Sequence, residues 1–131
     1  MPSKHAEDEV AVILTDDEAE MLREGFRTWG GPGHPSDALA QAIGFRNVES
    51  LLSIGYDLVA QLQPGRVILT RRNWTRALLS LEISFGSDVG AGYEWSIVTR
   101  FTDETAVRLL RGLQLKLVAV RMRPQDLEPL S

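Results

Sequence analysis

The chain has no cysteine, and this absence excludes disulfides, thiolate zinc sites and cysteine nucleophiles. It has only two histidines, His5 and His34, and neither lies in a catalytic or metal-binding motif. No apolar run approaches the ~20 residues that a membrane-spanning helix needs. The first nine residues also lack the hydrophobic region of a signal peptide. We therefore expect a cytoplasmic protein with no membrane contact and no resident metal or cofactor.

An excess of basic residues is also missing. The 131 residues contain 14 Lys and Arg against 18 Asp and Glu, for a net charge of −4. This balance argues against general nucleic-acid binding, which depends on surplus Lys and Arg. The charge is uneven, because residues 1–28 hold three basic and eight acidic residues while residues 64–123 hold ten basic and five acidic ones. We expect the acidic first helix to lie near the basic C-terminal half.

The length matches one domain that can bury a core without metals or disulfides. Residues 1–9 are interpreted as a mobile acidic leader, residues 10–123 as a single helical domain, and residues 124–131 as a frayed tail.

Three segments show the chemistry of a helix start, a threonine that follows an apolar residue. Thr15 and Glu18 fit a capping box, and Leu69 and Trp74 fit a hydrophobic staple. Apolar residues at helical spacing follow these and two further caps. The helices predicted are 16–29, 37–43 after Ser36, 48–62 after Asn47, the segment from the Thr70 cap to Phe85, and 103–120.

The predicted fold is therefore all-α, a single domain of about five helices. The alternative is an α+β fold with a β-hairpin at 78–101. Residues 79–85 alternate between apolar and polar, and a similar alternation from Tyr93 to Phe101 follows the glycine-rich segment 86–92. We favour the helix because the cap and the staple at 69–74 commit the chain early.

Two helices have unusually wide apolar surfaces. In the third, apolar positions cover more than half of the circumference, which is typical of a central helix packed on several neighbours. In the fourth, Leu79 and Ile83 fall on the side opposite Trp74 and Phe85. This second strip needs a second partner, either the apolar run 10–14 or another copy of the chain. Leu79 and Ile83 are thus the candidate self-interface of a homodimer.

Arg71, Arg72 and Arg76 form the candidate anion-binding group. Arginine in the first turn of a helix is unfavourable against the helix dipole and favours a bound anion, although pairing with carboxylates of the first helix explains these residues more simply. A candidate pocket is formed by residues of two loops and of the fourth helix, with Glu82 as a half-buried carboxylate that either acts as an acid or base or is paired. Its residues are Trp29, His34, Glu82, Asp88, Tyr93 and Trp95. The spacing of His34, Asp88 and Glu94 is no metal signature.

Residues 36–56 resemble an AraC-type helix-turn-helix. Ala40 and Gly44 stand where that motif has small residues, and Phe45 and Leu51 where it has apolar ones. However, no Lys or Arg occurs from Asn47 to Gly65, and such a helix would repel phosphates. A plain two-helix corner is the preferred interpretation.

Three further segments carry a second resemblance. They are Trp74-Thr75-Arg76-Ala77-Leu78-Leu79, Tyr93-Glu94-Trp95 and Arg108-Leu109-Leu110-Arg111-Gly112-Leu113-Gln114. With them, residues 15–118 resemble small uncharacterised helical proteins of high-GC bacteria. That group implies no activity, ligand or catalytic residue, only a bacterial cytoplasmic protein.

The sequence favours a non-catalytic interaction or regulatory domain that self-associates, and no catalytic set can be named. One alternative is a binder of a small molecule or anion, or an enzyme, with a pocket between the 29–35 and 86–95 loops. Another is nucleic-acid binding through the C-terminal arginines, which are Arg71, Arg72, Arg76, Arg108 and Arg111.

Overall fold

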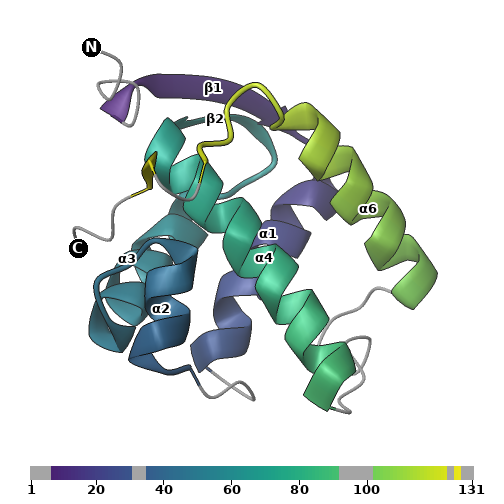
Figure 1. Ribbon diagram of the computed structural model, residues 1–131. Coiled ribbons are helices and arrows are strands. Elements are labelled where there is room, and N and C mark those ends of the chain that lie inside the picture. The colour runs from purple at the N-terminus through teal and green to yellow at the C-terminus, as the bar shows by residue number, and fades with distance from the viewer. Residues whose placement is uncertain (1–6, 31–34, 92–101, 124–125, 128–131) are drawn as a thin grey trace.

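The computed structural model describes residues 7–30, 35–91, 102–123 and 126–127. In chain order its elements are β1 (Glu9–Leu14), α1 (Asp16–Gly30), α2 (Asp37–Ile43), α3 (Val48–Gln61), β2 (Gly65–Thr70), α4 (Arg71–Ala91) and α6 (Asp103–Lys116). Helices α1 and α4 cross in the middle of the molecule, α2 and α3 lie on one side of them, α6 lies on the other, and β1 and β2 cover one end (Figure 1). The chain is mostly helical, as expected, with five helices among the described residues.

The predicted helix starts are confirmed by their hydrogen bonds. Thr15 and Glu18 close a capping box, in which each backbone N–H donates to the other side chain at 3.0 and 3.1 Å. Ser36, Asn47, Thr70 and Thr102 each accept from a backbone N–H three residues on. Gly44 ends α2 with φ at +102°, a conformation that favours glycine.

Two strands accompany the helices, so the fold fits the α+β alternative as much as an all-α fold. β1 and β2 pair antiparallel, with Val10 opposite Leu69 and Val12 opposite Val67. The two strands lie 50 residues apart in sequence, so local patterning does not reveal their pairing. The β-hairpin considered at 78–101 is wrong for residues 78–91, which are helical, and residues 92–101 lie outside the described part. The run 10–14 is thus a strand that pairs with β2.

The core lies where α1 meets α4. The apolar residues at helical spacing in α1 are all buried, and they pack with residues of α4 that include Trp74 and Leu81. They are Ala19, Met21, Leu22, Phe26 and Trp29. Across this contact Trp29 Nε1 donates to Ser80 Oγ at 3.0 Å, and Ser80 Oγ donates to the carbonyl of Gly25 at 3.0 Å. The two helices are therefore joined by a buried polar link as well as by apolar packing.

The chain that follows α6 returns across α4. Met122 N donates to Thr75 Oγ1 at 3.0 Å, and the guanidinium of Arg121 binds both carboxylate oxygens of Glu82 at 2.7 and 2.9 Å. Leu127 is buried beside Gly44. The second strip of the fourth helix thus has a partner in its own chain, because Leu79 packs against Met122 and Leu127.

Candidate functional site

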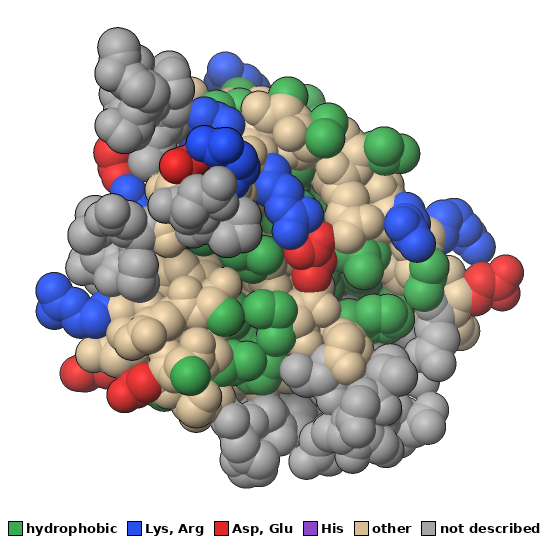
Figure 2. All heavy atoms as spheres, viewed as in Figure 1, with side chains coloured by type: hydrophobic (Ala, Val, Ile, Leu, Met, Phe, Trp, Pro, Cys, Tyr) green, Lys and Arg blue, Asp and Glu red, His purple; other side chains and the backbone are tan. Residues whose placement is uncertain are grey.

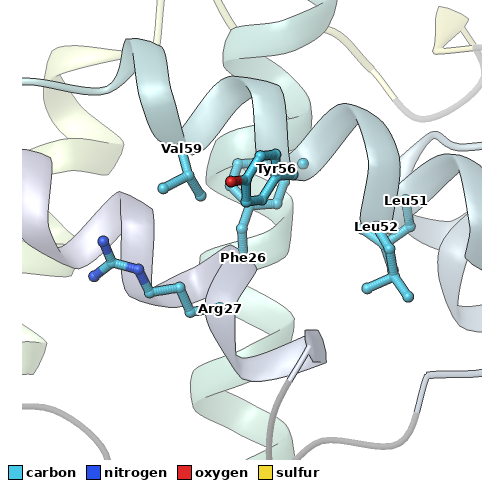
Figure 3. Close-up of a pocket in the computed structure, with 7 residues that line it drawn as sticks. Phe26, Arg27, Leu51, Leu52, Tyr56 and Val59 are labelled. Carbon is cyan, nitrogen blue, oxygen red and sulfur yellow. The ribbon is translucent and has the colours of Figure 1, made fainter.

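A hollow of ≈ 360 Å³ opens between α1 and α3. It is lined by Phe26 and Arg27 of α1 and by Leu51, Leu52, Gly55, Tyr56 and Val59 of α3. Figure 3 shows these side chains, with Tyr56 in front of Phe26 and with Arg27 and Leu52 toward opposite sides. The lining is apolar except for the Arg27 guanidinium and the Tyr56 hydroxyl, so the hollow is suited to an apolar group.

At the hollow, α3 meets α1 through a glycine. A Cβ atom on Gly55 would lie 3.1 Å from Phe26 Cδ1, so a larger residue would press on the buried phenyl ring. The spacing of Leu52, Gly55, Tyr56 and Val59 puts them along one side of α3. The side chains at the rim are open to water, with Tyr56 79% and Leu52 41% exposed.

Four charged residues of α1 meet beside the hollow. Arg27 Nη1 lies 2.7 Å from Glu24 Oε2 and 3.5 Å from Glu20 Oε2, and Arg23 Nη2 donates to Glu20 at 2.5 Å. Burial raises the pKa of Glu24, and its hydrogen bond with Arg27 opposes this only in part. Burial acts on Glu20 in the same direction, but its hydrogen bonds and the two arginine charges outweigh it and lower the pKa of Glu20. The group contains two arginines and two glutamates. Arg27 is therefore already paired with carboxylates and does not need a bound anion.

The exposed charged side chains of α3 are acidic. Glu49 and Asp57 are exposed, Glu49 one turn before Leu52 and Asp57 next to Tyr56. From Asn47 to Gly65 the chain has no Lys or Arg. A group that enters the hollow therefore meets apolar walls, and the exposed charges elsewhere on α3 are negative.

The three arginines of the candidate anion group separate in the structure. Arg71 Nε donates to the carbonyl of Val120 at 3.0 Å, and Arg72 Nε pairs with Glu7 at 3.1 Å. Arg72 therefore pairs with an acid before β1, although the sequence suggested the carboxylates of the first helix. The acidic first helix does contact the basic C-terminal half through Glu18 and Lys116, at 2.5 Å.

Arg76 is buried in the protein. Its Nε donates to the carbonyl of Gly44 at 3.0 Å, its Nη1 donates to Asn73, and its guanidinium lies 4.4 Å from the centre of the Phe45 ring. Burial lowers the pKa of Arg76 to about 10, and the charge of Arg72 acts in the same direction while Glu7 opposes it. Arg76 therefore stabilises the contact between α4 and the end of α2, which is a structural role.

The candidate pocket of the two loops is only partly described. Trp29 is buried, and Glu82 is held by Arg121 and by Gln114 Nε2 at 2.6 Å, so the paired state considered for Glu82 is the one observed. Asp88 lies in α4, but its side chain is outside the described part, as are His34, Tyr93 and Trp95 entirely. Within the described residues, no three His, Asp or Glu side chains gather into a metal-holding group.

The two side chains of the candidate self-interface are only partly exposed. Leu79 and Ile83 are partly buried and pack against the core of their own chain. The large apolar side chains that are clearly exposed belong to other elements. They are Ile13, Leu52, Tyr56, Ile68, Val107, Leu115 and Val118.

Sequence patterning missed the hollow and the residues around it. It predicted α3 as a central helix, but α3 packs on α1 and α2 and leaves Leu52 and Tyr56 in water. The sequence does show an apolar surface wider than half of this helix, and within the described part of the chain Leu52 and Tyr56 on that surface are exposed. On the face of α4 and α6, by contrast, most of the visible Lys and Arg side chains lie in the upper half, toward the strands (Figure 2).

Comparison with family models, with curated proteins and with solved structures found no match. None of the helices in the described ranges is long and apolar enough to cross a membrane.

Proposed function

We propose that the chain is a non-catalytic interaction domain that docks a basic amphipathic helix of another protein against the hollow between α1 and α3. The observation that carries this proposal is the exposure of Tyr56 and Leu52 at the rim of an apolar hollow of ≈ 360 Å³. Grooves of this kind take apolar side chains that recur along one face of a helix. The cytoplasmic location and the self-association expected from the sequence remain parts of the proposal.

The charge of the rim selects the kind of partner. Glu49 and Asp57 are exposed on α3, and Arg27, the cation that lines the hollow, is paired with Glu20 and Glu24. A helix with apolar anchors and lysines at its flanks would meet opposite charge there, whereas an acidic helix would be repelled. The anchors supply the affinity, and the flanking charges supply orientation and rate of association.

The test uses a fluorescein-labelled helical peptide of leucine and lysine, with leucines at positions i, i+4 and i+7 and lysines elsewhere. Its binding is followed by fluorescence anisotropy, with a peptide in which glutamate replaces lysine as the control. We expect Tyr56→Ala to weaken binding at least tenfold, because a tyrosine that becomes buried under the docked helix contributes about 2 kcal/mol or more. Leu115→Ala removes a side chain that is 76% exposed on α6 and should leave binding unchanged.

Charge variants separate docking from simple attraction. We expect Glu49→Gln and Asp57→Asn to weaken the leucine and lysine peptide in low salt and to have little effect in high salt, because salt screens exposed charges. Equal binding of the lysine and the glutamate peptides, or equal binding by the Tyr56→Ala variant, would refute the proposal.

A second candidate function is the binding of a small apolar molecule in the same hollow. The volume of ≈ 360 Å³ supports it, because small-molecule pockets commonly measure about 300–1,000 Å³. Indole serves as the probe in a thermal-shift assay, where a ligand at 100 times its Kd adds about 2.7 kcal/mol of stability. The high exposure of Tyr56 favours the protein partner, since a small ligand would leave this side chain largely in water.

Nucleic-acid binding has less support. Arg71, Arg72 and Arg76 each bind a group of their own chain, which leaves Arg108 and Arg111 of α6 as the exposed members of that set.

A further inference from the structure

The two edges of the two-stranded sheet differ: on the outer edge of β1 one carbonyl accepts a hydrogen bond from α6, and on the outer edge of β2 the described residues show no such bond. Arg71 N donates to the carbonyl of Asp8 at 2.9 Å, in line with the register of β1 and β2. Antiparallel partners alternate between bonded and non-bonded pairs, so the backbone groups of Val67 and Leu69 point toward β1. Those of Arg66 and Ile68 point away from β1, to the outer edge of β2.

The same alternation is visible on β1. There the carbonyl of Ile13 points to the outer edge, and Lys116 Nζ of the last turn of α6 donates to it at 2.8 Å. The outer edge of β2 has no such cover: in the described ranges, no hydrogen bond outside the β1–β2 ladder involves Arg66 or Ile68. Such an edge is a template for another strand.

We propose that the outer edge of β2 pairs antiparallel with β2 of a second copy, giving a four-stranded sheet across the dimer. This inference rests on the self-association in the proposed function and is independent of the hollow between α1 and α3. With Ile68 opposite the partner's Ile68, Arg66 falls opposite the partner's Thr70. A two-fold axis requires such reciprocal contacts, and this register satisfies them.

The outer face of that sheet is complementary to itself. Ala11 lies opposite Ile68 in each copy, so the central row across the four strands is Ala11, Ile68, the partner's Ile68 and the partner's Ala11. Ile68 is 47% exposed in the single chain and would be covered by its counterpart. The apolar side chain at the edge thus gains a partner of its own kind.

The flanking rows pair opposite charges. In each copy Thr70 lies opposite Glu9, so Arg66 and the partner's Glu9 share one row of the sheet, about 9–10 Å apart at the backbone. Both side chains are exposed, and neither forms an ion pair within the part of the chain that the structure describes. Arginine and glutamate side chains can span this distance over the intervening threonine. A dimer that paired through the outer edge of β1 would instead require Lys116 to break its hydrogen bond with the carbonyl of Ile13.

Two measurements test the dimer in the full chain. Light scattering over a hundredfold concentration range should give a mass that rises from 14.6 kDa toward twice that value. Hydrogen exchange followed by NMR should show the amides of Arg66 and Ile68 becoming protected at high concentration, while those of Ala11 and Ile13 on the outer edge of β1 should not change.

Ile68→Lys would place two ammonium groups across the two-fold axis, and we expect it to raise the dimer Kd at least tenfold. Leu115→Lys, at an exposed position of α6 outside the two strands, should leave the mass unchanged. A mass of 14.6 kDa throughout, exposed Arg66 and Ile68 amides in a dimer, or an Ile68→Lys variant that still dimerises would overturn the inference. These outcomes leave peptide binding by Tyr56 untouched, so the two proposals fail separately.

Discussion

Gly25 of α1 lies so close to Leu81 of α4 that a Cβ atom on Gly25 would be 2.8 Å from Leu81 Cα. The backbones of the two central helices are in contact at this point. Only a residue without a Cβ atom allows so close an approach. The same contact brings the carbonyl of Gly25 within 3.0 Å of Ser80 Oγ. The position of α3 and its hollow depends on α1, so this crossing supports the candidate site indirectly.

Gly25→Ala should lower the free energy of unfolding by about 1–3 kcal/mol, because the added methyl group forces two backbones apart. The better helix propensity of alanine offsets only about 1 kcal/mol of this loss. Gly112→Ala is the matched control, since a Cβ there meets nothing within 4 Å and should stabilise α6 by up to about 1 kcal/mol. Urea unfolding measures both, and equal effects of the two variants would contradict the close crossing.

Ser80→Ala should destabilise the chain by about 1–3 kcal/mol, because the buried indole N–H of Trp29 and the carbonyl of Gly25 each lose a partner. Trp29→Phe removes the indole donor, and in a double-mutant cycle with Ser80→Ala the two losses should be less than additive. Fully additive losses in urea unfolding would show that Trp29 and Ser80 are not bonded.

Leu127→Ala tests how firmly the end of the chain is attached. Leu127 is buried beside Gly44, so the truncation should cost about 2 kcal/mol or more. Leu115→Ala, at an exposed position, should change stability by less than about 0.5 kcal/mol. If the two variants unfold at the same urea concentration, the segment around Leu127 contributes nothing to the fold.

Glu20 and Glu24 should have opposite pH signatures. The raised pKa of Glu24 stabilises the folded chain at low pH, and this contribution is lost as pH rises through that pKa, above 4.5. The lowered pKa of Glu20 stabilises the folded chain above pH 4.5, and this contribution is lost as pH falls.

As the pH rises from 3.5 to 7, the free energy of unfolding of wild type should therefore decrease relative to that of Glu24→Gln. Relative to that of Glu20→Gln it should increase. Urea unfolding at a series of pH values measures both differences. Slopes of the same sign would show that the pKa values of Glu20 and Glu24 are not shifted in opposite directions.

The parts of the fold that could be predicted are those that neighbouring residues determine. The caps at Thr15, Ser36, Asn47 and Thr102 are contacts between residues three apart, and each helix begins where its cap predicted. The buried face of α1 was also predictable, because helical spacing alone puts its apolar residues on one side.

The parts that could not be predicted depend on distant residues. Val12 meets Val67 across 55 residues, and Leu79 meets Leu127 across 48. Nothing in the local pattern distinguishes Val67 and Leu69 in a strand from apolar residues at the start of a helix. For the same reason the wide apolar surface of α3 predicts a central helix, although Tyr56 on that surface is 79% exposed.

The most direct test of the proposed function is an NMR titration of the ¹⁵N-labelled chain with the leucine and lysine peptide. The account predicts saturable shifts at one peptide per chain, concentrated on the amides of Leu52, Gly55, Tyr56 and Val59 and lost in the Tyr56→Ala variant. Shifts that avoid α3, or that persist unchanged in Tyr56→Ala, would contradict it.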